Sequence, residues 1–449
     1  MSSMGAIQQV TLRLLVACFA FFTPFIASPA VAQLEIDITE GVVEPLPIAI
    51  SEFFGQDPEA IRIGRDIADV VSADLQSSGL LRPLDRRAFI QSPEELQNLP
   101  RFADWRQINA QALVAGTVIA GDGATDITVE FRLWDVFSGS QMRGLRFTAA
   151  EDQWRRIAHR IADAVYQRIT GEDGYFDSQI VYVSETGPAL DRVKRIAVMD
   201  QDGANHRFLT DGSDLVLTPR FNPEGTSIAY MAYRGRVPQI YERSLLTNSE
   251  RPFGDFPGMT FAPKFSPEGN QLAMSLASNG NTDLYLLDLQ NGLTTSRRRL
   301  TTSQSIDTSP SFSPDGSELV FNSDRAGSPQ LYVMAVNGGE PKRISFGGGN
   351  YGSPTWSPRG DLIAFTKIKG GLFHIGIMRT DGSDERLLTR SALDEAPTWA
   401  PNGRVILFSR KNYSTNSTRL FTIDVTGYNE RELPTPLDAS DPDWSTLIP

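Results

Sequence analysis

One short motif recurs through the C-terminal part of the chain: a proline, any residue, an aromatic ring, a short side chain and a second proline. Consecutive copies begin 44, 47, 44, 43 and 45 residues apart, close to the ~40–45 residues of a four-stranded propeller blade. The copies occupy residues 219–225, 263–269, 310–316, 354–360, 397–403 and, in shortened form, 442–445. This spacing predicts a β-propeller.

The motif and the segments that follow it have the chemistry of tight turns and strands. In Ser313-Pro314-Asp315-Gly316 the proline fixes φ at the second position of the turn, and the glycine ends it. We expect the aromatic residue to fill the space between neighbouring blades, where one ring buries a large apolar area. After each complete motif come β-rich runs separated by turns, such as residues 319–322 and 330–334.

The two ends of the array are complementary. Residues 180–184 match the strand that follows a motif, although no motif precedes them, and residues 442–445 are a motif with no strand after it. Five complete repeats and one split repeat predict six blades. Pairing of the C-terminal strand with the first segment would close the ring and remove its free edges. An open solenoid or a row of sandwiches is the alternative, and it does not explain these complementary ends.

The segment before the repeats alternates strand and helix patterns. Helices are predicted over residues 58–78 and 151–169, and strands over 46–50, 111–119, 127–134 and 142–148. The apolar stripe of the first helix is expected to comprise Ile61, Ile67, Val70, Val71 and Leu75. The predicted fold class is therefore α+β multidomain, with an N-terminal α/β domain over residues 33–175 and a six-bladed β-propeller over residues 176–449.

The first 32 residues have the three parts of a secretory signal peptide. Arg13 precedes the apolar run 14–22, and Ala30-Val31-Ala32 forms a cleavage site. We predict cleavage after Ala32 and export. A membrane anchor is the alternative, but the uninterrupted apolar run is shorter than the ~20 residues of a spanning helix. Because the single cysteine, Cys18, lies in this leader, we expect the exported chain to lack disulfides. No later segment approaches the length of a spanning helix, so we also expect the exported chain not to span a membrane.

The sequence lacks the motifs of several large enzyme classes. The serine-hydrolase elbow, the zinc-protease motif and the phosphate loop are absent, and no predicted helix opens with a dinucleotide fingerprint. His159, His206 and His374 are scattered without metal-ligand spacing. Asp200-Gln201-Asp202-Gly203 falls where the other repeats have a hairpin turn, so we interpret it as a turn and not as a calcium loop. The formal net charge of −12 argues against a nucleic-acid partner.

We therefore predict that the chain is not an enzyme and uses no metal and no cofactor. Two alternatives remain. The first is a propeller enzyme, a lyase or hydrolase, whose catalytic residues would meet in the central channel. The second is a glycan-binding propeller, which would present a row of aromatic rings on one face.

A short strand is predicted at the start of the exported chain. Its apolar and polar residues alternate, so one face of the strand is apolar. The strand comprises Leu34, Glu35, Ile36, Asp37, Ile38 and Thr39. It is either an edge strand of the α/β domain or a detachable strand that adds to the sheet of a partner.

The leader, the α/β domain and the repeated motifs, in this order, resemble the TolB family of the Tol-Pal cell-envelope system. The resemblance covers the whole chain. It implies a monomeric periplasmic adaptor that keeps the outer membrane intact and helps it constrict during cell division. In this family the mouth of the propeller binds the lipoprotein Pal, the N-terminal strand binds the inner-membrane protein TolA, and some bacteriocins use the same mouth.

The resemblance also implies site residues. The strand from Leu34 to Thr39 matches the TolA-binding strand of the family in position and alternation. The loops that enter the motifs match the Pal-binding mouth; their residues are Met259, Thr260, Phe261, Asp307, Thr308, Ser309, Tyr351, Leu393, Asp394 and Glu395. Two positions depart from the family pattern, because Met259 stands where a histidine is expected and Ser309 where a glutamate is expected.

Overall fold

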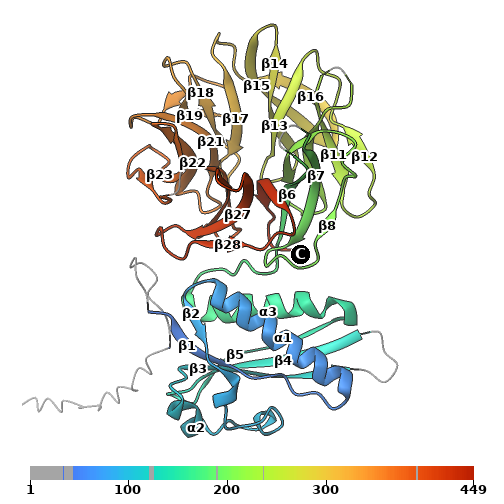
Figure 1. Ribbon diagram of the computed structural model, residues 1–449, viewed down its shortest axis with the longest axis vertical. Helices are drawn as coiled ribbons and strands as arrows, with labels where there is room; N and C mark the ends of the chain where they lie inside the picture. The colour runs from blue at the N-terminus through green and yellow to red at the C-terminus, as the bar shows by residue number, and fades with distance from the viewer. Residues whose placement is uncertain are drawn as a thin grey trace, which may run out of the picture. The chain divides into compact units, whose positions relative to one another are not determined.

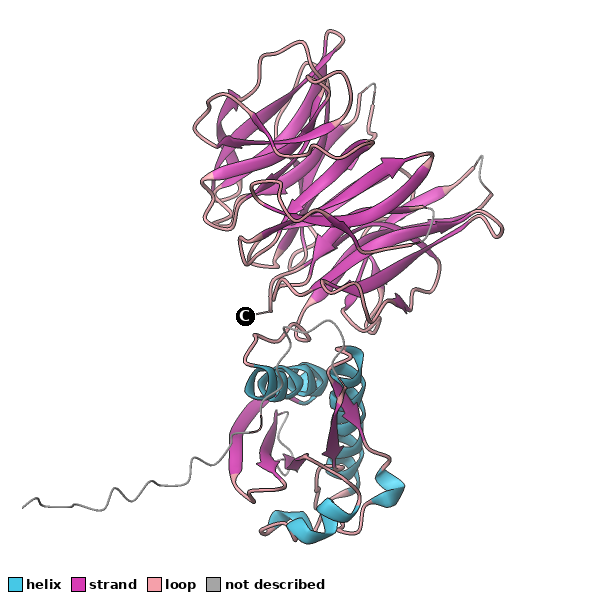
Figure 2. Cartoon of the chain, turned by 90° about the vertical axis from the view of Figure 1, so that its left-hand side faces the viewer, coloured by secondary structure: helices cyan, strands magenta, loops and turns pink. Residues whose placement is uncertain are grey.

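The computed structural model describes residue 34 and residues 44–120, 126–188, 191–235, 237–390 and 393–448. The predicted leader lies outside the described residues, and so does the predicted N-terminal strand after Leu34. The described residues from Glu44 onward belong to one compact unit. It contains an α/β domain and a propeller, and the helices are confined to the α/β domain (Figures 1 and 2).

The described part of the α/β domain has a five-stranded sheet in the order β2-β1-β3-β4-β5. Strands β3, β4 and β5 form an antiparallel meander, and β1 pairs in parallel with both β2 and β3. The strands are β1 (Leu46–Ile50), β2 (Leu81–Pro83), β3 (Ala112–Ala120), β4 (Asp126–Asp135) and β5 (Gln141–Ala150). This confirms the predicted strands and adds β2, which is too short to show a period in the sequence.

Two long helices, α1 (Pro58–Ser77) and α3 (Trp154–Thr170), contact each other and the sheet. The Asp57 carboxylate caps α1 by accepting from the backbone N–H groups of Glu59 and Ala60 at 3.0 and 2.9 Å. Helix α3 ends at Gly171, whose φ of 73° suits a residue without a Cβ. Both helices confirm the prediction.

Three details of the predicted helices were wrong. Ile61 is 43% exposed, and Ile63 takes its place among the buried residues of α1. The segment Glu151–Gln153 is a 3-10 turn and not part of α3. The short elements α2 (Phe102–Gln107), Arg86–Ala88 and Glu95–Gln97 were not predicted, because one or two turns show too little periodicity to stand out.

The described residues of the C-terminal part form six four-stranded antiparallel sheets. Their strands are β9 (Val216–Phe221), β10 (Ser227–Ala232), β11 (Gln239–Ser244), β12 (Glu250–Pro252); β13 (Met259–Phe265), β14 (Gln271–Ser278), β15 (Asn281–Gln290), β16 (Leu293–Arg299); β17 (Asp307–Phe312), β18 (Glu318–Ser323), β19 (Gln330–Ala335), β20 (Lys342–Arg343); β21 (Asn350–Trp356), β22 (Leu362–Lys369), β23 (Leu372–Arg379), β24 (Arg386–Leu387); β25 (Asp394–Trp399), β26 (Val405–Asn412), β27 (Ser417–Asp424), β28 (Arg431–Leu433); and β29 (Asp438–Trp444), β6 (Gln179–Thr186), β7 (Val193–Asp200), β8 (Arg207–Phe208). This confirms the six-bladed propeller.

The last sheet closes the ring. Strand β29 pairs antiparallel with β6, with Ala439 opposite Ser184 and Trp444 opposite Ile180. The Trp444 indole N–H also donates to Ser178 Oγ at 2.8 Å. The predicted closure by the C-terminal strand is therefore confirmed.

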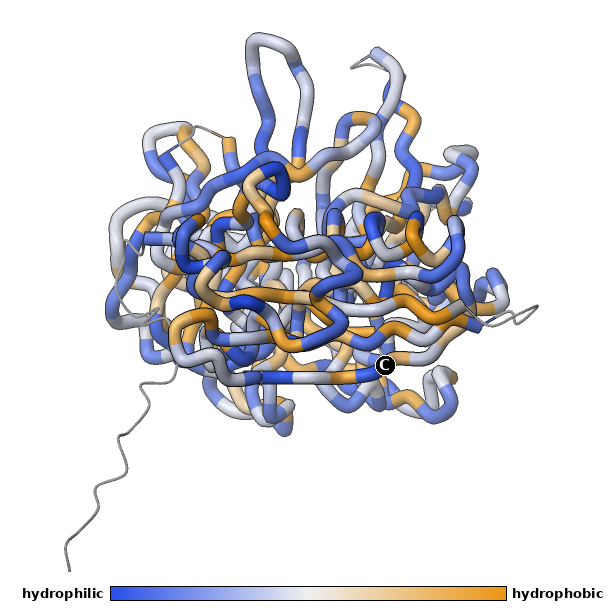
Figure 3. Tube along the Cα trace, turned by 90° about the horizontal axis from the view of Figure 1, so that it is seen from below, coloured by the Kyte–Doolittle hydropathy of each residue, from blue (hydrophilic) through white to orange (hydrophobic). Residues whose placement is uncertain are grey.

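The motif aromatics pack between blades as predicted. Their exposed fractions lie between 5 and 8%. Phe265, for example, packs against Ala229 and Ile240 of the preceding blade and against Leu272 of its own. In the turn that follows, the N–H of the motif glycine donates to the residue three positions earlier, as Gly316 does to the Ser313 carbonyl at 2.9 Å. Apolar strand segments and hydrophilic turns alternate along the chain (Figure 3).

Candidate protein-binding site

The inner strand of every blade carries the motif and lines a central channel. At the end where the motif turns lie, the six aromatic residues and the second prolines of the five complete motifs surround a cavity of about 280 Å³. A second cavity of about 110 Å³ lies beside the residues that precede the motif. The two cavities share Lys264, Ser311, Thr355, Thr398 and Asp443.

A bulge occurs at the same point of each inner strand. The residue immediately before the first motif proline has a positive φ in all six blades, and the strand pairing shifts register there. The six residues are Thr218, Ala262, Ser309, Ser353, Ala396 and Asp441, with φ between 47 and 55°. Residues other than glycine rarely adopt this conformation, which costs roughly 1–2 kcal/mol each. Because all six line the second cavity, the bulges set the shape of the channel wall.

Two charged side chains of the channel form an ion pair, and they come from β13 and β29, the inner strands on either side of β9. Lys264 Nζ lies 3.1 Å from Asp443 Oδ1. Asp443, which is buried, also accepts from the backbone N–H of Phe221 at 2.9 Å. The described residues that line the two cavities include no histidine and no cysteine. The lining therefore offers neither an imidazole base nor a thiolate nucleophile.

The predicted mouth residues lie at the opposite end of the inner strands from the motif turns. Five of the ten are buried and serve the fold. Asp307 accepts two hydrogen bonds from Arg325, at 2.9 and 3.0 Å, and Asp394 accepts two from Arg410, at 2.7 and 3.0 Å. The five buried residues are Thr260, Asp307, Tyr351, Leu393 and Asp394.

The other five predicted residues are available to a partner. Met259, Phe261, Thr308 and Ser309 are half-buried, and Glu395 is exposed. They come from three blades, through strands β13, β17 and β25, and the blade of β21 separates the last of these from the other two. The structure thus divides the predicted set into residues that hold the inner strands in place and residues that reach the surface.

The same end of the propeller carries exposed apolar side chains that the motif did not reveal. They lie in the loops that enter the inner strands and in the hairpins beside those loops. We call them the rim residues: Leu215, Tyr233, Val237, Ile306, Phe346 and Tyr413, with Phe346 and Tyr413 the most exposed at 71% each. Large exposed apolar side chains that gather on one surface are typical of a surface that binds another protein, whereas single ones are common on any protein. The sequence contains a sign of the rim residues, because each of them is an apolar residue that stands among residues typical of turns.

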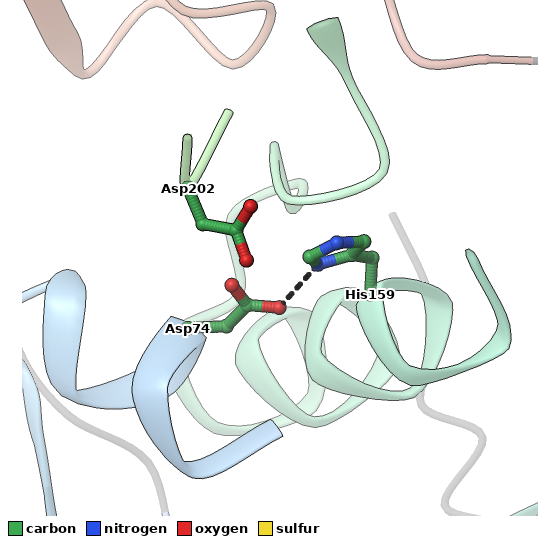
Figure 4. Close-up of side chains that lie close together, drawn as sticks. All are labelled: Asp74, His159 and Asp202. Carbon is green, nitrogen blue, oxygen red and sulfur yellow. Dashed lines mark hydrogen bonds and ion pairs between the residues drawn. The ribbon is translucent and has the colours of Figure 1, made fainter. Parts of the chain in front are cut away.

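A polar cluster joins the two domains. Asp74 of α1 and His159 of α3 are buried, and His159 Nδ1 lies 2.6 Å from Asp74 Oδ2 (Figure 4). From the turn between β7 and β8, Gln201 Nε2 donates to Asp74 Oδ1 at 2.8 Å. Asp202 of the same turn forms an ion pair with Arg155 of α3. The spacing of the three histidines gave no sign of this cluster, because its members come from distant parts of the sequence.

Burial alone would lower the pKa of His159, but the carboxylates of Asp74 and Asp202 raise it to about 9. The pKa of Asp74 is raised above its usual range, first by burial and then by Asp202, against the opposing effect of His159. Asp74, His159 and Asp202 have a spacing that could hold a metal ion. The oxygens of both carboxylates and His159 Nδ1, however, already pair with protein groups, so the donor set fits an ion-paired network better than a metal site.

None of the helices in the described part of the chain combines the length and the apolarity needed to cross a lipid bilayer.

Comparison with known proteins agrees with this architecture. Residues 34–142 match the family model of the TolB amino-terminal domain, and residues 166–448 match that of the TolB beta propeller domain. The Tol-Pal system protein TolB of Gluconobacter oxydans (strain 621H) is 44% identical over 438 residues, which are 96% of this chain and 93% of the relative. The protein of the same name from Paramagnetospirillum magneticum is 56% identical over 234 residues, 52% of each chain.

The solved structures give the same result. The crystal structure of TolB from Acinetobacter baumannii superimposes with a TM-score of 0.79 at 26% identity, and the match covers 92% of this chain and 100% of that one. The match spans both the α/β domain and the propeller.

Proposed function

We propose, from the premise that this chain belongs to the TolB family of the Tol-Pal system, that it is a periplasmic adaptor that binds other proteins and catalyses no reaction. The observation that carries the proposal is the mouth of the propeller. There a closed ring of blades presents exposed apolar rim residues beside half-buried polar ones. A rigid surface of this kind loses little conformational freedom when a partner binds.

The partner proposed for the mouth is a Pal lipoprotein. The rim residues Phe346 and Tyr413 can insert into a partner, since large exposed rings dominate the energetics of many interfaces. At Met259 and Ser309 the family pattern has a histidine and a glutamate, so this chain is expected to contact Pal there through a thioether and a hydroxyl. Some bacteriocins are proposed to use the same surface.

The partner proposed for the N-terminal strand is TolA. The support is the alternation of Leu34, Ile36 and Ile38 with polar residues, which suits the addition of one strand to the edge of a partner's sheet. Through these two contacts the chain would link Pal to TolA. This link would help to keep the outer membrane intact and to constrict it during cell division.

The test measures both contacts on the chain from Gln33 onward, by titration calorimetry with the soluble part of Pal and with the C-terminal domain of TolA from the same organism. Phe346→Ala and Tyr413→Ala are each expected to weaken Pal binding at least tenfold, as interface anchors do. Leu246→Ala is the matched control, because Leu246 is 78% exposed but lies on the opposite end of the propeller.

A chain that begins at Gly41 is expected to keep its affinity for Pal and to lose TolA binding. Unchanged TolA binding by this shortened chain would show that the strand is not the TolA site. Pal binding that survives both rim substitutions would remove the mouth from the proposal.

A further inference from the structure

The cluster of Asp74, His159, Gln201 and Asp202 joins elements that meet only in the folded protein. Asp74 lies near the end of α1 and His159 in α3, and both are about 98% buried or more. The propeller contributes a single turn, whose Gln201 donates to the same carboxylate that faces His159. Asp74 is therefore held from both domains, and the contact depends on the charge that it carries.

The charged groups that act on His159 come from both helices and from the propeller turn: Asp74 from α1, Arg155 from α3 and Asp202 from the turn. A second set interacts with these groups or with one another: Asp163 with Asp74 and with Asp177, Arg156 with Asp177, and Asp200 with Arg155. The carboxylates in this set outnumber the arginines. When His159 is protonated it supplies the positive charge that lies between Asp74 and Asp202, whose oxygens are within 4.8 Å of one another and of the imidazole.

Loss of the proton from His159 changes the balance of charge at the contact between the domains. Asp74 and Asp202 would then face each other as like charges in a site with little water, where their repulsion is weakly screened. Arg155 offsets Asp202, but among the described residues the remaining donor to Asp74 from the propeller is the neutral Gln201 amide.

The contact also has a built-in weakness. His159 Nε2 is buried and has no hydrogen-bond partner in the described part of the chain. A buried donor without an acceptor costs free energy, so protonated His159 stabilises the contact by less than its ion pair alone would. Such a partly satisfied network is easier to open than a complete one.

We propose that Asp74, His159, Gln201 and Asp202 form a proton-sensitive latch, which holds the β7–β8 turn of the propeller against α1 and α3 while His159 is protonated and releases it when His159 is neutral. The inference goes beyond partner binding, since it concerns the chain alone.

The direction of the pH effect follows from proton linkage. His159 has a pKa of about 9 when the latch is closed and would return toward ~6.5 when it opens. A group whose pKa is higher in the closed form favours that form at low pH. The ratio of open to closed molecules is therefore expected to rise roughly tenfold per pH unit between these two values.

The experiment measures the distance between the domains by pulsed electron resonance. From Gln33 onward the chain has no cysteine, so two spin labels can be placed on Leu99→Cys and Leu246→Cys, both at exposed positions, one in each domain. At pH 7 a single narrow distance is expected. At pH 9.5 a second, longer population is expected to appear.

His159→Gln is expected to abolish this difference between the two pH values, because glutamine does not titrate. His206→Gln is the matched control: burial lowers the pKa of His206, away from the range between pH 7 and pH 9.5, and the pH response should persist. Asp202→Asn keeps the shape of the turn and removes the like charge, so it is expected to shrink the population that appears at pH 9.5.

Three results would overturn the proposal. The first is a wild-type distance distribution that is the same at pH 7 and pH 9.5. The second is a pH response that survives in both His159→Gln and Asp202→Asn. The third is a distance distribution that does not change with pH but becomes narrower when Zn²⁺ is added and broader again with EDTA. That result would make the cluster a metal site.

Discussion

Trp444→Ala tests the closure of the propeller. The Trp444 ring is 7% exposed and packs edge-on against Tyr175, with ring centroids 5.9 Å apart. Its indole N–H donates to Ser178 Oγ, which itself donates to the Tyr175 carbonyl at 2.6 Å. The substitution therefore removes a buried ring together with its own donor and leaves no group unpaired. Truncation of a buried Trp or Phe to Ala costs about 3–5 kcal/mol.

The expected loss of about 4 kcal/mol is a large part of the ~5–15 kcal/mol that stabilises a typical domain. Urea unfolding followed by circular dichroism measures it. Trp356→Ala, at the same motif position of the fourth blade and 8% exposed, should cost a similar amount. Tyr413→Ala is the control, because this ring is 71% exposed and surface changes usually stay within about 0.5 kcal/mol.

Closure itself is tested by a chain that ends at Leu437 and so lacks β29. Its β6 would present a free edge, and free edges pair with other chains, so size-exclusion chromatography should show oligomers. Trp356→Ala keeps β29 and should remain monomeric. If Trp444→Ala costs less than about 1 kcal/mol, or if the shortened chain stays monomeric and folded, the reasoning about closure is wrong.

Three further predictions follow from contacts described above. Asp394→Ala should lower stability by about 3 kcal/mol in urea unfolding, because it leaves the partly buried Arg410 with fewer partners; a loss below about 1 kcal/mol would contradict the structural role of Asp394. Asp57→Ala should cost about 1 kcal/mol through loss of the α1 cap, whereas Asp57→Asn should cost much less. Between pH 6.5 and 9 the wild-type protein should lose up to about 3 kcal/mol of stability, since the pKa of His159 is raised to about 9, and thermal melts of His159→Gln should lack this component.

The architecture of the propeller could be predicted from the sequence because its information is local and repeated. Each motif contains its own turn residues and the aromatic side chain that packs between two blades. Six weak signals that recur at one period therefore combine into a strong prediction of a propeller. The orphan strand at 180–184 and the orphan motif at 442–445 then required a closed ring, and β6 and β29 pair as expected. The long amphipathic helices α1 and α3 were predicted for the same reason.

The details of the candidate site could not be predicted with the same success. The family pattern placed Asp307, Tyr351 and Asp394 in the mouth, but it cannot show that their side chains turn inward to Arg325, Lys367 and Arg410. Their partners lie 16 to 18 residues further along the chain, on or beside the neighbouring strand, and the motif does not include them. The roles of the ten predicted mouth residues and of the strand from Leu34 to Thr39 stay predictions.

The cluster at Asp74 shows a different limit. His159 lies on a helix whose spacing indicates only a buried face, and Asp202 belongs to a segment that was correctly interpreted as a turn. Their meeting depends on how the α/β domain packs against the propeller, and no periodic pattern in either part encodes that packing.

The pairing of β29 with β6 joins residues separated by about 260 positions in the chain. Contacts between such distant residues form slowly, since a long loop must close before they stabilise anything. A protein that emerges from a translocation pore N-terminus first therefore passes most of its length through the pore before one of its blades can assemble. Until that moment β6 can pair only with β7 and lacks its other neighbour in the sheet, and chaperones and proteases have that interval in which to act on the unfinished ring.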